Sequence, residues 1–235
     1  MLTERRKDGI LVVALRFSVL FFEVIMLKHF VKSFLGGFVI AIGAVACLSV
    51  ENKALGAFLF TLGVFSVSSF GFCLFTGKVC FIPNKQSSFI KDIILTYLGN
   101  FIGTVSLGLV LPFTKLSILV PKAQEIAALK LSDTLFSAFV MSVLCGMIIC
   151  ISVLGFKTIK YGTGKYIALF LPIMVYILAG FENSIANLFY YTFAGAWGSP
   201  ALIHSAVVAL GNLIGGTLIP FAAKYTDNIK LGCEE

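Results

Sequence analysis

Charged residues are scarce in this sequence, and histidine is scarcer still. Asp, Glu, Lys and Arg make up 12% of the 235 residues, and only His29 and His204 carry imidazole rings. A soluble domain has about 25% charged residues, so this composition excludes an ordinary water-soluble protein. The six cysteines form no Cys-x-x-Cys pair, and with two histidines they offer little material for a metal site. We therefore expect no metal and no cofactor.

Hydrophobic residues are abundant instead. They make up 59% of the chain, and the mean hydropathy is +1.01. Apolar runs long enough to cross ~30 Å of hydrocarbon recur along the sequence. The net charge is +7, but the cations lie in separate loops, which argues against nucleic acid as a partner. Basic loops on one side of a membrane set its topology and contact anionic lipid, so the sequence predicts a multi-pass protein of the lipid bilayer.

Six apolar segments divide the chain, and we expect each to cross the membrane as a helix. They cover residues 34–50, 55–72, 93–111, 134–156, 166–193 and 201–223. Together they predict a six-span domain over residues 33–225, followed by a short tail over 226–235. In residues 1–32, Arg16 and Glu23 fall on one helical face because they are seven residues apart, which favours a separate interfacial amphipathic helix.

The distribution of lysine and arginine predicts the orientation. Six spans place both termini on one side of the membrane. The N-terminus, the turns at 78–91 and 157–165, and the tail are all basic, so we expect them to face the cytoplasm of a plasma (inner) membrane. The loop at 112–133 then faces outward although it carries three lysines.

Two nearly identical strings stand at the same ordinal place in each half of the chain. GNFIGT begins at Gly99 in the third segment, and GNLIGG begins at Gly211 in the sixth. Three spans per repeat is an odd number, so the second copy enters the membrane inverted. Polar interruptions at 74–77 and 182–184 pair in the same way. Irregular backbone at membrane depth is tolerated where it is buried in protein or lines a water-filled cavity, so these breaks predict a translocation site.

Each polar residue at these breaks also has a structural interpretation. A carboxylate near the bilayer centre costs at least ~2.5 kcal/mol, so Glu182 either serves function or accepts backbone N–H groups at a half-helix N-terminus. Asn100 and Asn212 could hydrogen-bond the opposite break and hold its shape. Thr76 could bond back to its own helix. Lys130 stands in a polar loop, where a solvated surface lysine is the ordinary outcome.

The motifs at the breaks resemble those of the formate/nitrite transporter family over roughly residues 31–225. The resemblance rests on Leu-Phe-Thr at 74–76, Gly-Phe-Glu-Asn-Ser-Ile-Ala-Asn at 180–187 and Gly-Asn-Leu-Ile-Gly-Gly at 211–216. It implies an all-α membrane protein with six transmembrane helices in an aquaporin-like inverted repeat, of which the second and fifth are broken. It also implies a homopentamer in which each protomer has its own pore for a small monovalent anion such as formate, nitrite or hydrosulfide.

The resemblance further assigns pore residues. Thr76 and Asn212 would stand at the pore centre and Asn183 would face the anion, so that all three hydrogen-bond it. Lys130 would point into the pore and attract the anion, while Glu182 holds the broken helix.

Two apolar constrictions would enclose this centre. The resemblance implies an outer constriction formed by Leu74, Phe75 and Ile149, and an inner one formed by Tyr176.

Two positions depart from the family pattern, because Asn183 and Cys73 replace its usual histidine and glutamate. Asparagine has no proton to give near neutral pH, so we expect weaker pH gating than in histidine-bearing members. Two other interpretations remain open: an integral-membrane enzyme, for which a nucleophile or metal cluster at depth is lacking, and an accessory subunit without transport activity. A water or glycerol channel would show paired Asn-Pro-Ala motifs, and none is present.

Overall fold

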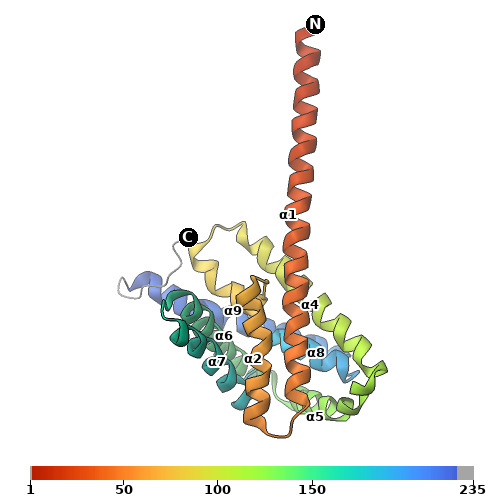
Figure 1. Ribbon diagram of the computed structural model, residues 1–235, viewed down its shortest axis with the longest axis vertical. Coiled ribbons are helices and arrows are strands. Elements are labelled where there is room, and N and C mark those ends of the chain that lie inside the picture. The colour runs from red at the N-terminus through yellow and green to blue at the C-terminus, as the bar shows by residue number, and fades with distance from the viewer. Residues whose placement is uncertain (1, 227–235) are drawn as a thin grey trace.

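The computed structural model describes the backbone of residues 2–226 and the side chains of residues 23–226. The described backbone is helical almost throughout (Figure 1). Its α-helices are α1 (Leu2–Leu48), α2 (Lys53–Phe70), α3 (Phe75–Lys78), α4 (Phe89–Val110), α5 (Val120–Ser132), α6 (Leu135–Thr158), α7 (Gly162–Leu178), α8 (Ser184–Phe193) and α9 (Ser199–Tyr225). Short 3-10 helices lie at η1 (Val79–Asn84), η2 (Leu111–Phe113) and η3 (Lys115–Leu119).

Within this part of the chain, five helices are long and apolar enough to cross a membrane. These are α2, α6, α9, the segment Glu23–Leu48 of α1, and α4 extended to Phe113, and α7 is a shorter apolar helix. The prediction of an all-helical multi-pass membrane protein is therefore confirmed. Large apolar side chains on the outer faces of α4 and α9, such as Ile94 and Leu202, are more than half exposed, as expected for lipid-facing positions.

The boundary predicted at residue 32 is wrong, because α1 continues unbroken through it (Figure 1). The apolar span begins at Glu23 instead of residue 34. The placement of Arg16 and Glu23 on one helical face favoured a separate helix, but no glycine or proline stands between Ile10 and Phe34 to end a helix. Long basic side chains can extend along a helix toward water, so a charged residue in this segment does not require a break. The predicted tail lies outside the described residues except for Thr226.

The two halves of the chain have matching packing. Helix α1 contacts α2 and α4 in the first half as α6 contacts α7 and α9 in the second. The short elements cross over: η1 of the first half packs on α9 of the second, and α8 of the second half packs on α4 of the first. This exchange is what an inverted repeat requires, since each half places its short helix against the other.

Both interruptions begin at a glycine in the left-handed conformation. Gly71 ends α2 at φ 67°, and Gly180 follows α7 at φ 73°. Nothing lies within 4 Å of a Cβ built at either position, so the backbone angle, and not space, favours glycine there. In each turn the next residue donates its backbone N–H five residues back, from Phe72 to Val67 and from Phe181 to Tyr176.

The repeated Gly-Asn strings lie where helices pack closely. A Cβ at Gly37 of α1 would stand 2.2 Å from the carbonyl oxygen of Asn100, and one at Gly146 of α6 would stand 2.5 Å from that of Asn212. Only a hydrogen in place of a side chain allows this approach. This close approach of the helices brings the side chains of the two asparagines next to the interrupted segments.

Candidate functional site

Asn100 and Asn212 each hold one interruption in shape. The Asn100 Oδ1 accepts the backbone N–H of Phe75 at 2.8 Å, while its Nδ2 donates to the carbonyls of Cys73 at 2.8 Å and Ser33 at 2.6 Å. This amide therefore ties the segment between α2 and α3 to α1 and α4.

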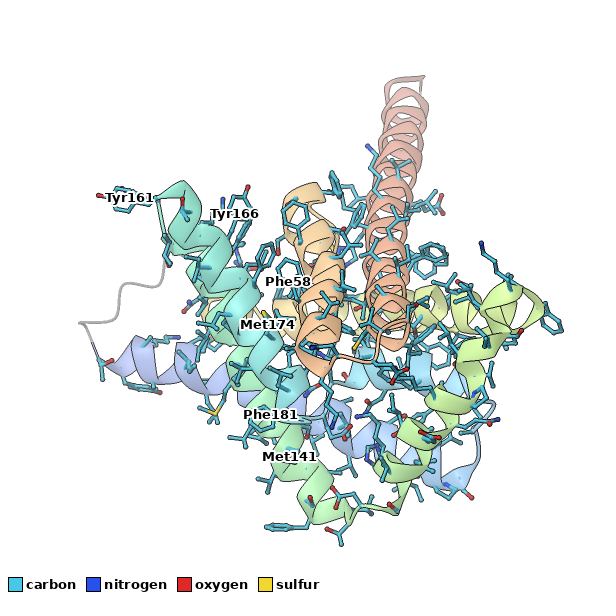
Figure 2. All side chains as sticks on the ribbon, turned by 60° about the horizontal axis from the view of Figure 1, so that its bottom comes forward. Phe58, Met141, Tyr161, Tyr166, Met174 and Phe181 are labelled. Atoms are coloured by element: carbon cyan, nitrogen blue, oxygen red, sulfur yellow. The ribbon has the colours of Figure 1, made fainter. Side chains whose placement is uncertain are left out.

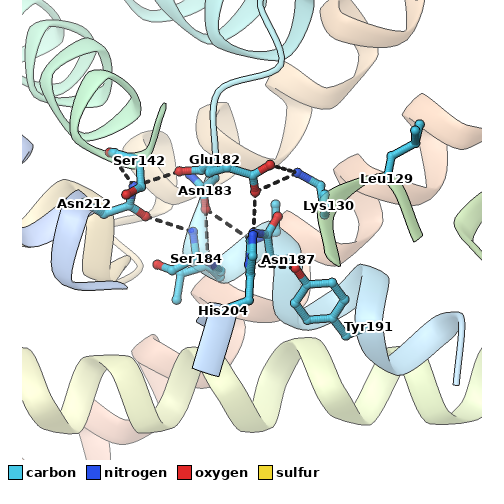
Figure 3. Close-up of polar contacts among 12 residues, drawn as sticks. Leu129, Lys130, Ser142, Glu182, Asn183, Ser184, Asn187, Tyr191, His204 and Asn212 are labelled. Atoms are coloured by element: carbon cyan, nitrogen blue, oxygen red, sulfur yellow. Dashed lines mark hydrogen bonds and ion pairs between the residues drawn. The ribbon is translucent and has the colours of Figure 1, made fainter. Parts of the chain in front are cut away.

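Asn212 makes the equivalent set of bonds in the second half (Figure 3). Its Oδ1 accepts the Ser184 N–H, and its Nδ2 donates to the carbonyls of Glu182 and Ser142, all at 2.8 Å. Both N–H groups of the amide are thus used within the protein. The prediction that Asn212 hydrogen-bonds the anion is contradicted by these contacts, and the structural alternative describes both asparagines.

Asn183 begins helix α8. Its Oδ1 accepts the backbone N–H groups of Ile185 at 3.0 Å and Ala186 at 3.1 Å, which is the ordinary contact of an N-cap. The side chain is buried next to Cys145. The cap uses the oxygen, and the amide also hydrogen-bonds the Cys145 thiol, so a second N–H of Nδ2 is the donor that Asn183 can offer to a solute.

Thr76 is fully buried in the first turn of α3, and its hydroxyl has no hydrogen-bond partner within residues 2–226. The predicted alternative, a bond back to its own helix, is therefore not formed. An unsatisfied buried hydroxyl costs about 1–3 kcal/mol, so such a group indicates a water or solute position. The Ser184 hydroxyl, at the corresponding turn of the second half, is also without a partner in this part of the chain.

Lys130 and Glu182 form a buried ion pair (Figure 3). The Lys130 Nζ lies 2.9 and 2.8 Å from the two carboxylate oxygens of Glu182, and the side chains are 16% and 8% exposed. The Asn187 Nδ2 donates to the same carboxylate at 2.6 Å. Lys130 is therefore not a solvated surface lysine. The carboxylate binds side chains and not the backbone N–H groups that the sequence suggested.

A cavity of about 540 Å³ opens on the other side of the interruptions. Leu74 and Ile149 line it together with three lysines, Lys78, Lys85 and Lys157. The rest of its wall is mostly apolar and includes aromatic rings from Phe72, Phe81, Phe89 and Phe156. A basic cavity with apolar walls favours anionic solutes over cations and neutral polar molecules.

Part of the predicted outer constriction is brought together, because Leu74 and Ile149 line the same cavity. Phe75 does not line the cavity that holds Leu74 and Ile149, because its ring packs edge-on against Tyr97 with centroids 4.9 Å apart. It faces an apolar groove between α4 and α9. Tyr176 is buried against Phe60, with ring centroids 5.9 Å apart.

The predicted order of the two constrictions is also wrong relative to the basic turns. Lys85 and Lys157 of those turns line the cavity, and Leu74 lines the same cavity. Helix α7 runs from Tyr161, beside one basic turn, to the far end near Phe181 (Figure 2). Tyr176 therefore lies toward the face opposite the basic turns.

Sequence reasoning missed several residues that complete the site. Ser33 and Ser142 supply carbonyls to the two asparagines, Asn187 supports Glu182, and Lys78 and Lys157 charge the cavity wall. The two serines could have been found by aligning the halves on their interruptions. Ser33 precedes Gly71 by the same number of residues as Ser142 precedes Gly180. The lysines gave no such signal, since basic residues in loops are ordinary.

Paired inverted halves, two interrupted helices and unpartnered polar groups beside a basic cavity define a membrane transport protein of the channel type. The sequence profile of the formate/nitrite transporter family matches residues 22–226. The chain belongs to this family, and membership places it among transport proteins and not among membrane enzymes.

Similar proteins agree with this assignment. The chain is 28% identical over 149 residues to the formate channel FocA of Haemophilus influenzae, covering 59% of this chain and 52% of that relative. This match spans about half the length of the relative. The chain is 26% identical over 234 residues to the formate channel FocB of Escherichia coli, covering 81% and 83% of the two chains.

Two solved structures have the same fold. A pentameric formate channel with formate bound superimposes with a TM-score of 0.74 at 22% identity, covering 88% of this chain and 99% of that one. An FNT family ion channel gives a TM-score of 0.75 at 19% identity, covering 86% and 91%.

Proposed function

We propose that this protein conducts small monovalent anions, with formate the first candidate and nitrite or hydrosulfide next. One observation carries the proposal: the Thr76 hydroxyl is buried without a partner among the described residues, at an interruption that lies beside a basic cavity. The hydrogen-bonding capacity of a buried hydroxyl in that position is satisfied if a solute or water binds to it. The FocA and FocB relatives, both named formate channels, support formate as the first candidate.

The cavity supplies the first step of the proposed mechanism. An anion entering it meets lysine side chains, which compensate for the loss of solvent and raise its local concentration. It then reaches Leu74 and Ile149, where dehydration costs several kcal/mol unless donors replace water. We assign that replacement to the Thr76 hydroxyl and the Asn183 Nδ2 group.

Lys130 acts from the opposite side in this proposal. Two of the three N–H groups of its ammonium point to the Glu182 oxygens, which leaves one for a solute. Because Glu182 compensates most of the charge, the pair offers a donor without binding the anion so tightly that it cannot leave. Fast conduction needs such weak binding. We assign the constriction on this side to Tyr176, whose ring is buried against Phe60.

We further propose that six-span protomers assemble as a homopentamer in the plasma membrane, with both termini in the cytoplasm. A solved relative of the same fold is a pentameric channel, and the wide exposed apolar faces of α4 and α9 would be covered by lipid or by neighbouring protomers.

The proposal is tested by reconstituting the purified protein in liposomes and measuring influx of formate, nitrite, hydrosulfide, acetate and lactate. We expect saturable flux of formate above that of protein-free liposomes, with larger anions slower. Flux of none of these anions, from protein that elutes as a folded oligomer, would overturn the proposal and favour an accessory subunit without transport activity.

A further inference from the structure

The cavity wall contains a histidine–lysine contact that the proposed pathway does not use. The His29 Nε2 on α1 lies 3.2 Å from the Lys78 Nζ on α3 and 2.8 Å from the Thr96 Oγ1 on α4. The Thr96 hydroxyl also lies 2.6 Å from the Asp92 carbonyl, to which it donates. Lys78 lines the cavity, and its ammonium lies 5.4 Å from the centroid of the Phe89 ring.

The neutral imidazole has two tautomers, and the Lys78 ammonium 3.2 Å from Nε2 favours the one with its proton on Nδ1. In that tautomer Nε2 is an acceptor and holds the Lys78 ammonium against the wall. When the imidazole is protonated, Nε2–H donates to Thr96, whose hydroxyl donates in turn to the Asp92 carbonyl. These two hydrogen bonds form without Lys78, and the Lys78 ammonium then has no acceptor at His29.

The charges around His29 also favour release of Lys78 once the imidazole is protonated. The charged side chains whose fields reach it are Lys78 on α3, Lys32 on α1 and Asp92 on α4. Two of the three are cations, and a protonated imidazole would stand 3.2 Å from the nearer one. Like charges at that separation repel strongly in a partly buried site, so the lysine moves toward the open side, which is the cavity.

We propose that His29 sets the position of an anion-binding lysine: neutral His29 holds the Lys78 ammonium at the wall, and protonated His29 releases it into the cavity to bind a small monovalent anion. This inference rests on the proposed function as an anion channel and adds its regulation. His29 is a positioning residue here, and Lys78 is the binding residue. Because the device acts on entry, it changes the anion concentration for half-maximal flux and leaves the maximal rate almost unchanged.

The test measures formate flux against formate concentration in liposomes at pH 7.5 and pH 5.0 for wild type, His29→Gln, Lys78→Met and Lys157→Met. Glutamine offers an acceptor at both pH values but does not titrate. The protonated fraction of formate itself changes with pH in every variant, so His29→Gln gives the baseline. We expect the half-saturating concentration of wild type to fall by about fivefold more than that baseline on acidification, the lower end of ordinary coupling between sites.

The variants separate the roles of the two residues. Lys78→Met is expected to lose the extra shift, whereas Lys157→Met, which changes a lysine of the same cavity without a histidine contact, is expected to retain it. Lys78→Arg keeps a cation and is expected to recover tight binding at pH 5.0. If Lys78→Met does not form the wild-type oligomer, wild type against His29→Gln decides the matter.

The inference is overturned if His29→Gln shows the same pH shift as wild type, or if folded Lys78→Met retains it. Wild-type flux without any extra pH shift refutes this inference and leaves the proposed function standing. Absence of wild-type flux for all anions refutes both.

Discussion

Replacing Asn212 by leucine distinguishes a structural amide from an anion ligand. Leucine has nearly the same shape, so the main change is the loss of three hydrogen bonds of 2.8 Å to Ser184, Glu182 and Ser142. The three backbone groups are left unpaired and buried, at about 1 kcal/mol or more each, or about 3 kcal/mol together. For a chain of this size, about 1 kcal/mol corresponds to roughly 2–4 °C in Tm, so we expect a fall of about 6–12 °C.

The assay is thermal unfolding of the purified oligomer in detergent, followed by formate flux measured below the transition. Asn100→Leu is the matched comparison, because Asn100 makes the same three contacts in the other half, and we expect a similar fall. Thr217→Val, which removes a hydroxyl bonded only within its own helix, should change Tm little. An Asn212→Leu protein with wild-type Tm and a raised half-saturating concentration would refute the structural role.

Three further substitutions test the remaining site residues. Thr76→Val removes the unpartnered hydroxyl, so we expect wild-type Tm with flux about tenfold lower, the effect of losing about 1.4 kcal/mol of interaction with the anion; a lower Tm with unchanged flux would contradict this. Lys130→Met leaves Glu182 as an unpaired buried carboxylate and should cost about 3–5 kcal/mol, of which added Glu182→Gln recovers a large part in the same melting assay; no recovery would show that the pair is not coupled. Asn183→His adds a titratable group, so maximal formate flux should vary between pH 5 and 7 more steeply than in wild type, and equal profiles would contradict the role given to Asn183.

Much of the fold was predictable because the helix interruptions leave local signals. The polar interruptions at 74–77 and 182–184 and the repeated Gly-Asn strings are visible in the sequence, and together they predicted two inverted halves. The length of α1 was not predicted, since polar residues along a helix do not determine where the helix ends. The part of α1 that belongs to the bundle is defined by its contacts with α2 and α4, which lie far from it in the sequence.

The site was harder to predict because its partners lie far apart in the sequence. Lys130 and Glu182 are separated by 52 residues, and either could have faced solvent or solute until their contact was seen. Asn212 was assigned to the pore because an amide can donate to an anion. The same two N–H groups can equally donate to backbone carbonyls, and residue type alone does not choose between these partners. Phe75 was assigned to the cavity on residue type in the same way, and its contact with Tyr97 lies outside what residue type reports.

The two interruptions have matching backbone turns but different side chains. We infer that this difference in side chains gives the two sides of the pathway different roles. Leu74 and Asn183 occupy equivalent positions one residue before a short helix, yet only Asn183 caps its helix with a side chain. The uncapped α3 carries the Thr76 hydroxyl, which has no partner among the described residues, beside the basic cavity. The capped α8 is instead preceded by Glu182, which pairs with Lys130 of α5 on the opposite side. An anion crossing the repeat would therefore pass from an open set of cations to a compensated ion pair. A site that attracts at one end and binds weakly at the other lets a charged solute enter without trapping it.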